Sequence, residues 1–123
     1  MPQVVIHGSS SINVENKKLL VHKIRESIPE LLKIPENIGQ VMFYETNAEN
    51  RSAHKSRDQN FIFIEITMCP GRSQDMKKTF VDRLMALLSE YRAVDPKGIN
   101  CVIHEIPPDN YFGGVSHKYI ENF

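Results

Sequence analysis

Short apolar runs alternate with amphipathic stretches along the chain, and this order occurs twice. Apolar runs at residues 1–8 and 61–68 predict two strands, and each is followed by a stretch with apolar positions at helical spacing. Further apolar runs at 40–45 and 100–105 predict a second strand after each helix. The pattern therefore predicts two successive β-α-β units.

The two predicted units match at an offset of 60 residues, which takes Asn13 to Ser73, each a candidate helix N-cap. The apolar helix positions that match are Leu20, Val21 and Ile24 against Phe80, Val81 and Leu84. We interpret the chain as one α/β domain, residues 1–123, with units at about 1–58 and 59–123 joined by the polar stretch 46–60. We expect a four-stranded mixed sheet with two helices on one face.

A sheet with helices on one face leaves its other face uncovered. The first strand of each unit is nearly continuous in apolar residues, at 4–6 and 61–64, which is typical of strands buried on both faces. We therefore expect an oligomer in which the sheets of several copies pack against one another.

Composition narrows the classes of partner. The chain has 15 Lys and Arg against 15 Asp and Glu, and no basic block, so neither nucleic acid nor an anionic membrane is an expected partner. No apolar run approaches the ~20 residues of a membrane span, and the N-terminus lacks a signal-peptide pattern. Cys69, Cys101 and the five histidines lack metal-ligand spacing, so no metal is expected. We expect a cytoplasmic protein with reduced thiols.

Proline at position 2, directly after the initiator methionine, is the clearest candidate for chemistry. Removal of Met1 would leave a secondary amine, with a basic lone pair that an internal proline amide lacks. Burial or a nearby cation would lower the pKa of this amine, so that it could accept a proton near neutral pH. Because residues 4–6 begin a strand at once, we expect Pro2 on an ordered element.

The loop before the second predicted helix holds a sharper motif, Pro70-Gly71-Arg72-Ser73. Gly71 allows the chain to turn, Ser73 caps the helix, and Arg72 projects from the loop. A guanidinium there offers a planar fork for a carboxylate. A solvated surface arginine is the alternative that this segment alone leaves open.

Together these residues resemble the tautomerase superfamily, whose members begin with a catalytic proline and are built from β-α-β units. The run Gly-Arg-Ser at 71–73, followed by Lys77, resembles the loop and helix start of 4-oxalocrotonate tautomerase. Residues 102–106 followed by 110–114 resemble that family's last strand and closing hairpin. Fused two-unit members of about this length include malonate semialdehyde decarboxylases and 5-carboxymethyl-2-hydroxymuconate isomerases. The resemblance implies a trimer that needs no cofactor.

The resemblance also implies roles for individual residues. Pro2 would be the general base or proton carrier, and Arg72 would bind a substrate carboxylate. Tyr111 or Phe112 falls near the aromatic residue that walls the pocket in this family. Asn100 stands where the family places an arginine, so one electrostatic contact is missing or relocated.

Several positions depart from the family pattern. The first unit has Ile12 at the position equivalent to Arg72, so we expect one site per chain. Arg51 and Arg57 in the polar connection are candidate second carboxylate ligands, with solvated loop arginines as the alternative. Decarboxylase relatives have an acidic residue after the first helix and two arginines flanking a proline. Here one arginine of that pair is kept, although Glu36 could supply the acid.

We therefore expect a cofactor-free keto–enol tautomerase or isomerase that acts on a small 2-oxo or 2-hydroxydienoate acid. Pro2 would move a proton between oxygen and carbon. Decarboxylation or hydration of a 3-oxo acid is an alternative that would need a cationic Pro2 amine. A non-catalytic interaction protein with the same fold is a second alternative, because a retained Met1 would leave Pro2 as an amide.

Overall fold

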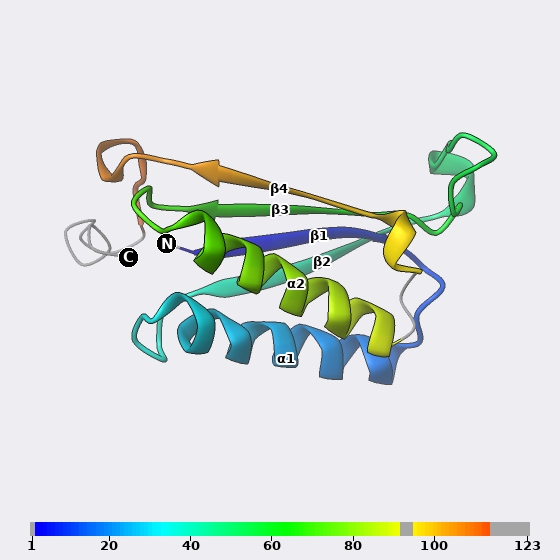
Figure 1. Ribbon diagram of the computed structural model, residues 1–123. Coiled ribbons are helices and arrows are strands. Elements are labelled where there is room, and N and C mark those ends of the chain that lie inside the picture. Colours follow the sequence, from blue (N-terminus) through cyan, green and yellow to red (C-terminus); the bar gives the residue numbers. More distant parts are fainter. Residues whose placement is uncertain (1, 92–94, 114–123) are drawn as a thin grey trace.

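The computed structural model describes residues 2–91 and 95–113, and over these residues it contains four strands and two α-helices (Figure 1). In chain order the elements are β1 (Gln3–Ser9), α1 (Val14–Leu32), β2 (Gln40–Thr46), β3 (Ile62–Met68), α2 (Gln74–Glu90) and β4 (Ile99–Glu105). Short 3-10 helices lie in the connections: η1 (Ala48–Asn50), η2 (Pro96–Gly98) and η3 (Pro108–Asn110). All the predicted strands are present.

The strands form one mixed sheet in the order β2-β1-β3-β4. β1 and β2 run parallel, as do β3 and β4, and the two units meet at the antiparallel pair of β1 and β3. Gln3 pairs with Gln40, and Phe63 pairs with Asn100. The parallel register is thus the same in both units after a shift of 60 residues, and the predicted pair of β-α-β units is confirmed.

Both helices begin at the predicted caps. The side chain of Asn13 accepts a hydrogen bond from the backbone N–H of Asn16 (2.8 Å), and the hydroxyl of Ser73 accepts one from the N–H of Met76 (3.1 Å). Each cap satisfies a backbone donor that the first helical turn would otherwise leave unpaired. The capping residues therefore fix where each helix starts above the sheet.

Both helices lie on one side of the sheet, and the core lies between these two layers (Figure 1). The fully buried helix positions again differ by 60 residues: Leu20, Ile24 and Ile28 in α1, and Phe80, Leu84 and Leu88 in α2. They pack on buried strand residues that alternate along β1 and β3, such as Ile6 and Ile64. Burial of one such side chain contributes about 1.5–3 kcal/mol.

An ion pair joins the first turn of each helix to the end of a strand. Lys17 of α1 pairs with Glu45 of β2, and Lys77 of α2 pairs with Glu105 of β4 (Nζ to Oε1, 3.3 Å). All four side chains are partly buried. The lysine and glutamate that match in sequence therefore also match in structure.

The opposite face of the sheet is open in the part of the chain that the structure describes. Met42, Tyr44 and Val102 lie on this face and are 47%, 49% and 37% exposed. No described helix has the length and apolar character needed to cross a membrane.

Candidate functional site

Four segments meet at the end of the sheet where β1 begins, which we call the Pro2 edge (Figure 1). They are Pro2 itself, the turn at 33–39, the loop at 69–73 and the segment at 106–113. Pro2 is buried, and its carbonyl accepts a hydrogen bond from the N–H of Gln40 (3.2 Å). The antiparallel pairing of Gln3 with Thr67, continued by one residue, places Pro2 beside Met68. Pro2 is thus on an ordered element, next to the loop that carries Arg72.

The loop at 69–73 holds Arg72 in place. Gly71 has a φ of 116°, a conformation that glycine adopts without a Cβ clash, and Ser73 caps α2 immediately afterwards. The half-buried Arg72 donates a hydrogen bond from Nη1 to the carbonyl of Cys69 (3.3 Å). The turn and the cap together keep the guanidinium at the Pro2 edge.

A cavity of about 580 Å³ opens between this loop and the end of α1. Its lining consists of Leu32, Lys33, Ile34, Cys69, Pro70, Gly71, Arg72, Ser73 and Met76. Arg72 and Lys33 give it two cations, while Leu32, Ile34 and Met76 give it an apolar wall. This combination suits a small organic anion.

Lys33 is a cavity residue that the sequence pattern did not identify. It ends α1 in a left-handed conformation (φ 58°), with its N–H bonded to the carbonyl of Pro29. This turn, rather than any motif, brings the lysine to the cavity. A lysine in the last turn of a predicted helix is ordinarily a solvated surface residue.

Cys69 also lines the cavity, but it is not poised as a nucleophile. Burial raises the pKa of its thiol, and the nearby Arg72 guanidinium opposes this shift only in part. Burial likewise raises the pKa of Cys101 to about 11. Both thiols therefore stay protonated near neutral pH.

The closing segment brings one predicted aromatic residue to the Pro2 edge. The hydroxyl of Tyr111 accepts a hydrogen bond from the side-chain amide of Gln3 (2.7 Å), the residue that follows Pro2. Phe112 is 78% exposed on the surface of the single chain. Met1, Gly114 and His117 lie outside the described residues, so removal of Met1 stays a prediction.

Three other predicted candidates lie at the opposite end of the sheet, which we call the Ile62 edge. It comprises Ile62, the loop at 9–13 and the segment at 46–61. Asn100 is the second residue of β4 and pairs with Phe63, about 17 Å along the strand from Met68 at ~3.3 Å per residue. Within one chain Asn100 therefore does not meet Pro2.

Arg51 and Arg57, near the same edge, are engaged in local contacts. Arg51 donates to the carbonyls of Phe61 and Gln59 and lies 4.0 Å from the centre of the Phe61 ring. Arg57 donates to the carbonyl of Lys97 (3.1 Å). Both arginines therefore hold loops together, and one chain does not bring either to the cavity.

Glu36, the candidate acid for a decarboxylase, lines a different hollow. It lies with His22, Arg25, Glu26 and Pro29 on the outer surface of α1. Another hollow of about 340 Å³ lies between α2 and β4 and contains Lys77 and Lys78. These lysines are paired with Glu105 and Asp82, so they are not available for an anionic substrate in the way that Lys33 is.

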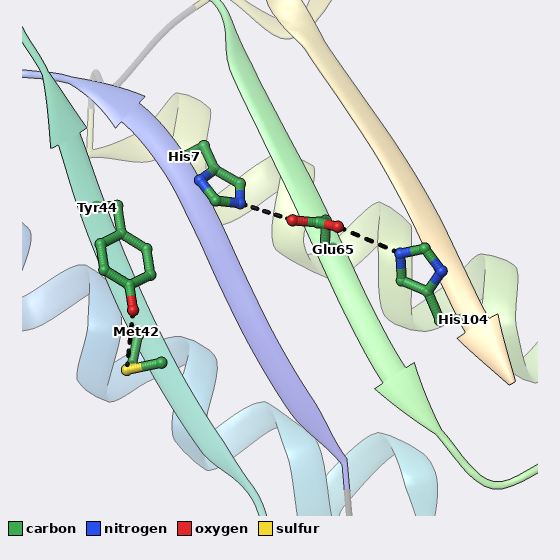
Figure 2. A network of polar contacts seen from close by, with 5 residues as sticks. All are labelled: His7, Met42, Tyr44, Glu65 and His104. Carbon is green, nitrogen blue, oxygen red and sulfur yellow. Dashed lines mark hydrogen bonds and ion pairs between the residues drawn. The ribbon is translucent and has the colours of Figure 1, made fainter. Parts of the chain in front are cut away.

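The structure also reveals a polar cluster that the sequence did not predict, on the open face of the sheet. Figure 2 shows Glu65 of β3 between His7 of β1 and His104 of β4. His7 Nε2 lies 2.7 Å from one carboxylate oxygen, and His104 Nε2 lies 3.3 Å from the other. We call these three residues the His–Glu–His bridge. Across the described residues no group of three or more His, Cys, Asp or Glu has the geometry of a metal site.

The comparisons with known proteins agree with this architecture. A family model described as "Tautomerase enzyme" matches residues 39–113, a range that includes Arg72, Lys77 and Tyr111. No curated protein sequence matches the chain.

Solved structures share the fold at low sequence identity. FG41 malonate semialdehyde decarboxylase, inhibited by 3-bromopropiolate, is 18% identical with a TM-score of 0.79, over 98% of this chain and 95% of that one. A macrophage migration inhibitory factor-like protein from Entamoeba histolytica is 19% identical with a TM-score of 0.79, over 94% and 96%. A fused 4-OT symmetric trimer is 14% identical with a TM-score of 0.83, over 94% and 96%.

Proposed function

The chain belongs to the tautomerase family, and we propose that it is a cofactor-free keto–enol tautomerase of small 2-oxo or 2-hydroxydienoate acids. The observation that carries this proposal is the burial of Pro2 at the edge where Arg72, Lys33 and Tyr111 lie. Pro2 would be the proton carrier, and Arg72 and Lys33 would supply two cations, although Pro2 and Tyr111 are not part of the cavity lining in the single chain.

Catalysis begins with the amine of Pro2, which is free once Met1 has been removed. Burial of Pro2 and the cationic Arg72 in the adjacent loop would both disfavour a charged amine, so that the neutral form could act as a base. The amine takes the hydroxyl proton of the enol and then delivers it to carbon, which leaves the ketone and regenerates the neutral amine. No other reactant is needed.

Arg72 and Lys33 hold the substrate by its carboxylate. A fork of two guanidinium hydrogen bonds orients the acid, and the positive charge stabilises the enolate that forms during proton transfer. Leu32, Ile34 and Met76 leave room for an apolar substituent beside the carboxylate. Phenylenolpyruvate has both parts and is a suitable test substrate.

Assembly as a homotrimer is part of the proposal. The sheet face with Met42, Tyr44 and Val102 is open in the single chain, and the similar fused 4-OT structure is a symmetric trimer. A trimer would also let residues of the Ile62 edge, such as Asn100, approach the cavity of a neighbouring copy. Light scattering at micromolar concentration should give the trimer mass, and a monodisperse monomer would exclude this assembly.

The test of the proposed activity combines three measurements on one preparation. Intact mass should show the loss of Met1, and titration of the amine should give a pKa below neutral pH. The same preparation should convert phenylenolpyruvate to phenylpyruvate. Retention of Met1 in all molecules would rule out the amine mechanism. An amine that stays cationic through neutral pH would favour the decarboxylase or hydratase chemistry instead.

A further inference from the structure

The His–Glu–His bridge occupies the middle of the face that the trimer would cover. The side chains of His7, Glu65 and His104 are 39%, 35% and 48% exposed, so water still reaches them in the single chain. Covering the face would remove this water. The charge of the bridge then decides the cost of assembly.

Protonation sets this charge. Hydrogen bonds from both histidines lower the pKa of Glu65, so its carboxylate is ionised near neutral pH. With two neutral imidazoles the bridge carries one negative charge, and with one imidazolium it is neutral. A second imidazolium would make it positive. The neutral form is the least costly to bury, because a buried charge needs a partner of opposite sign.

The surroundings favour His7 as the residue that holds the proton. His7 is the closer of the two imidazoles to the carboxylate, at 2.7 Å. It also lies between two aromatic neighbours, with ring centres 5.7 Å from Tyr44 and 6.0 Å from Phe63. Aromatic rings attract a neighbouring cation, and His104 has no such pair of rings among the described residues.

The other described groups that face the bridge from the packed strands bring no further charge. β2 presents the phenol of Tyr44 (Figure 2), and the remaining strand positions that alternate onto this face are uncharged: Gln3, Val5, Ser9, Gln40, Met42, Thr46, Phe63, Thr67, Asn100 and Val102. Tyr111 lies at one end of the face, bonded to Gln3, and Arg51 lies at the other, over Phe61. Among the described groups on this face, the His–Glu–His bridge is therefore the main one whose protonation can change when the face is covered.

We propose that the open face is buried in the homotrimer with one proton held on the bridge by His7, so that assembly takes up about one proton per chain. This inference rests on the proposed trimer and adds its regulation by pH. The proton stays on the covered bridge to a higher pH than on the free chain. The stabilisation is complete below the pH at which the free bridge titrates, and it is lost as pH rises through the titration of the covered bridge.

The experiment is sedimentation equilibrium of the purified chain from pH 6 to pH 8.5. The trimer equilibrium constant should fall as pH rises, by up to about a thousandfold per pH unit, because three chains each release about one proton on dissociation. Calorimetric dilution in buffers of different ionisation enthalpy should count the same protons directly. If the trimer is too tight for dilution, the concentration dependence of its urea midpoint gives the constant.

Three variants locate the proton. Glu65→Gln removes the negative charge, so the neutral imidazoles become the preferred buried form and the trimer should strengthen with rising pH, opposite to the native chain. His7→Gln should abolish most of the pH dependence, whereas His104→Gln should retain it. His22→Gln is the matched control, because His22 pairs with Glu26 at 2.7 Å on the exposed surface of α1. It should behave as the native chain does.

The outcomes separate this inference from the proposed function. A trimer whose constant does not change with pH overturns the proton linkage and leaves the trimer and the activity intact. A monomer at every pH overturns the assembly itself. If the trimer equilibrium constant of His7→Gln still depends on pH, the proton is not held on His7.

Discussion

The two ends of the sheet have the same backbone conformation after their second strands, but their side chains differ. η1 at the Ile62 edge and η3 at the Pro2 edge begin and end at positions 60 residues apart, and both lead into an extended residue. That residue is Arg51 at one end and Tyr111 at the other. Arg51 binds the carbonyls of its own loop, whereas Tyr111 binds Gln3 beside Pro2.

The difference shows which features the two units share and which they cannot share. Caps, ion pairs and strand register recur in both units, because each depends on side chains that any internal position can hold. Pro2 corresponds to Ile62, and Arg72 corresponds to Ile12. An amine needs a chain terminus, and the second unit begins in the middle of the chain. The Pro2 edge can therefore hold the proposed site, whereas the Ile62 edge cannot hold an equivalent one.

Among the tests of this difference between the two edges, blocking the amine of Pro2 should have the largest effect on activity. Acetylation of the terminal amine, after Met1 is removed, should lower kcat/KM for phenylenolpyruvate by about 10²–10⁴-fold, since the general base is lost. An absorbance assay of ketonisation measures it. Ile62→Val, at the equivalent position, should cost about 0.5–1.5 kcal/mol of stability and leave kcat/KM unchanged. Full activity after quantitative acetylation would remove the amine from the mechanism.

Arg72→Ala should have the next largest effect. Loss of a charged hydrogen bond of about 1.5–3 kcal/mol should lower kcat/KM roughly tenfold to a hundredfold, with a rise in KM. Steady-state kinetics of Arg57→Ala, which removes an arginine near the Ile62 edge, should match the native chain. Equal losses in the two variants would show that an arginine of the Ile62 edge, from a neighbouring copy, shares the carboxylate with Arg72.

The two units also pack differently where a glycine and a phenylalanine in the first unit replace two apolar side chains of the second. A Cβ added at Gly8 would lie 2.6 Å from Cζ of Phe43, whereas the equivalent positions hold Met68 and Ile103. Gly8→Ala should therefore lower the free energy of unfolding by about 1–3 kcal/mol, and Phe43→Ile in the same chain should recover part of it. Urea titrations of the two single variants and the double variant measure the coupling. Additive losses would mean that the ring moves aside freely.

The smallest expected effect is at the repeated ion pairs. Lys17→Met and Lys77→Met should each lower the free energy of unfolding by about 0.2–1 kcal/mol, and less at high salt, because the pairs are only partly buried. Lys18→Met, at an exposed neighbouring position, is the control in the same denaturation series. If the Lys17 and Lys77 variants are as stable as the control, the repeated pairs contribute nothing measurable.

Most of the fold could be predicted because its determinants are local. Asn13 and Ser73 cap helices whose first turns follow at once, and the apolar spacing within each unit marks the buried faces. The positions of Arg72 and Tyr111 at the Pro2 edge follow from where β3 and β4 end. Asn100 could not be placed in the same way, since any contact with the proposed site would depend on how copies of the chain assemble.

The features that escaped prediction depend on distant residues or on backbone conformation. Glu65 meets His7 across 58 residues of sequence and His104 across 39, and no spacing rule connects them. Lys33 reaches the cavity through a left-handed turn that lysine rarely adopts. A periodic pattern predicts which face of a single helix or strand is buried. It does not predict side-chain contacts between residues that are distant in sequence.

The position of Glu65 also limits how the protein could be built from simpler parts. Val5 and Glu65 are direct cross-strand partners, and they are equivalent positions of the two units. Two identical half-chains related by a twofold axis would bring this residue against its own copy. A dimer with glutamate at both places would hold two carboxylates face to face, and one with valine would hold none. A single shared carboxylate therefore requires two halves that differ at this position, as they do in this chain.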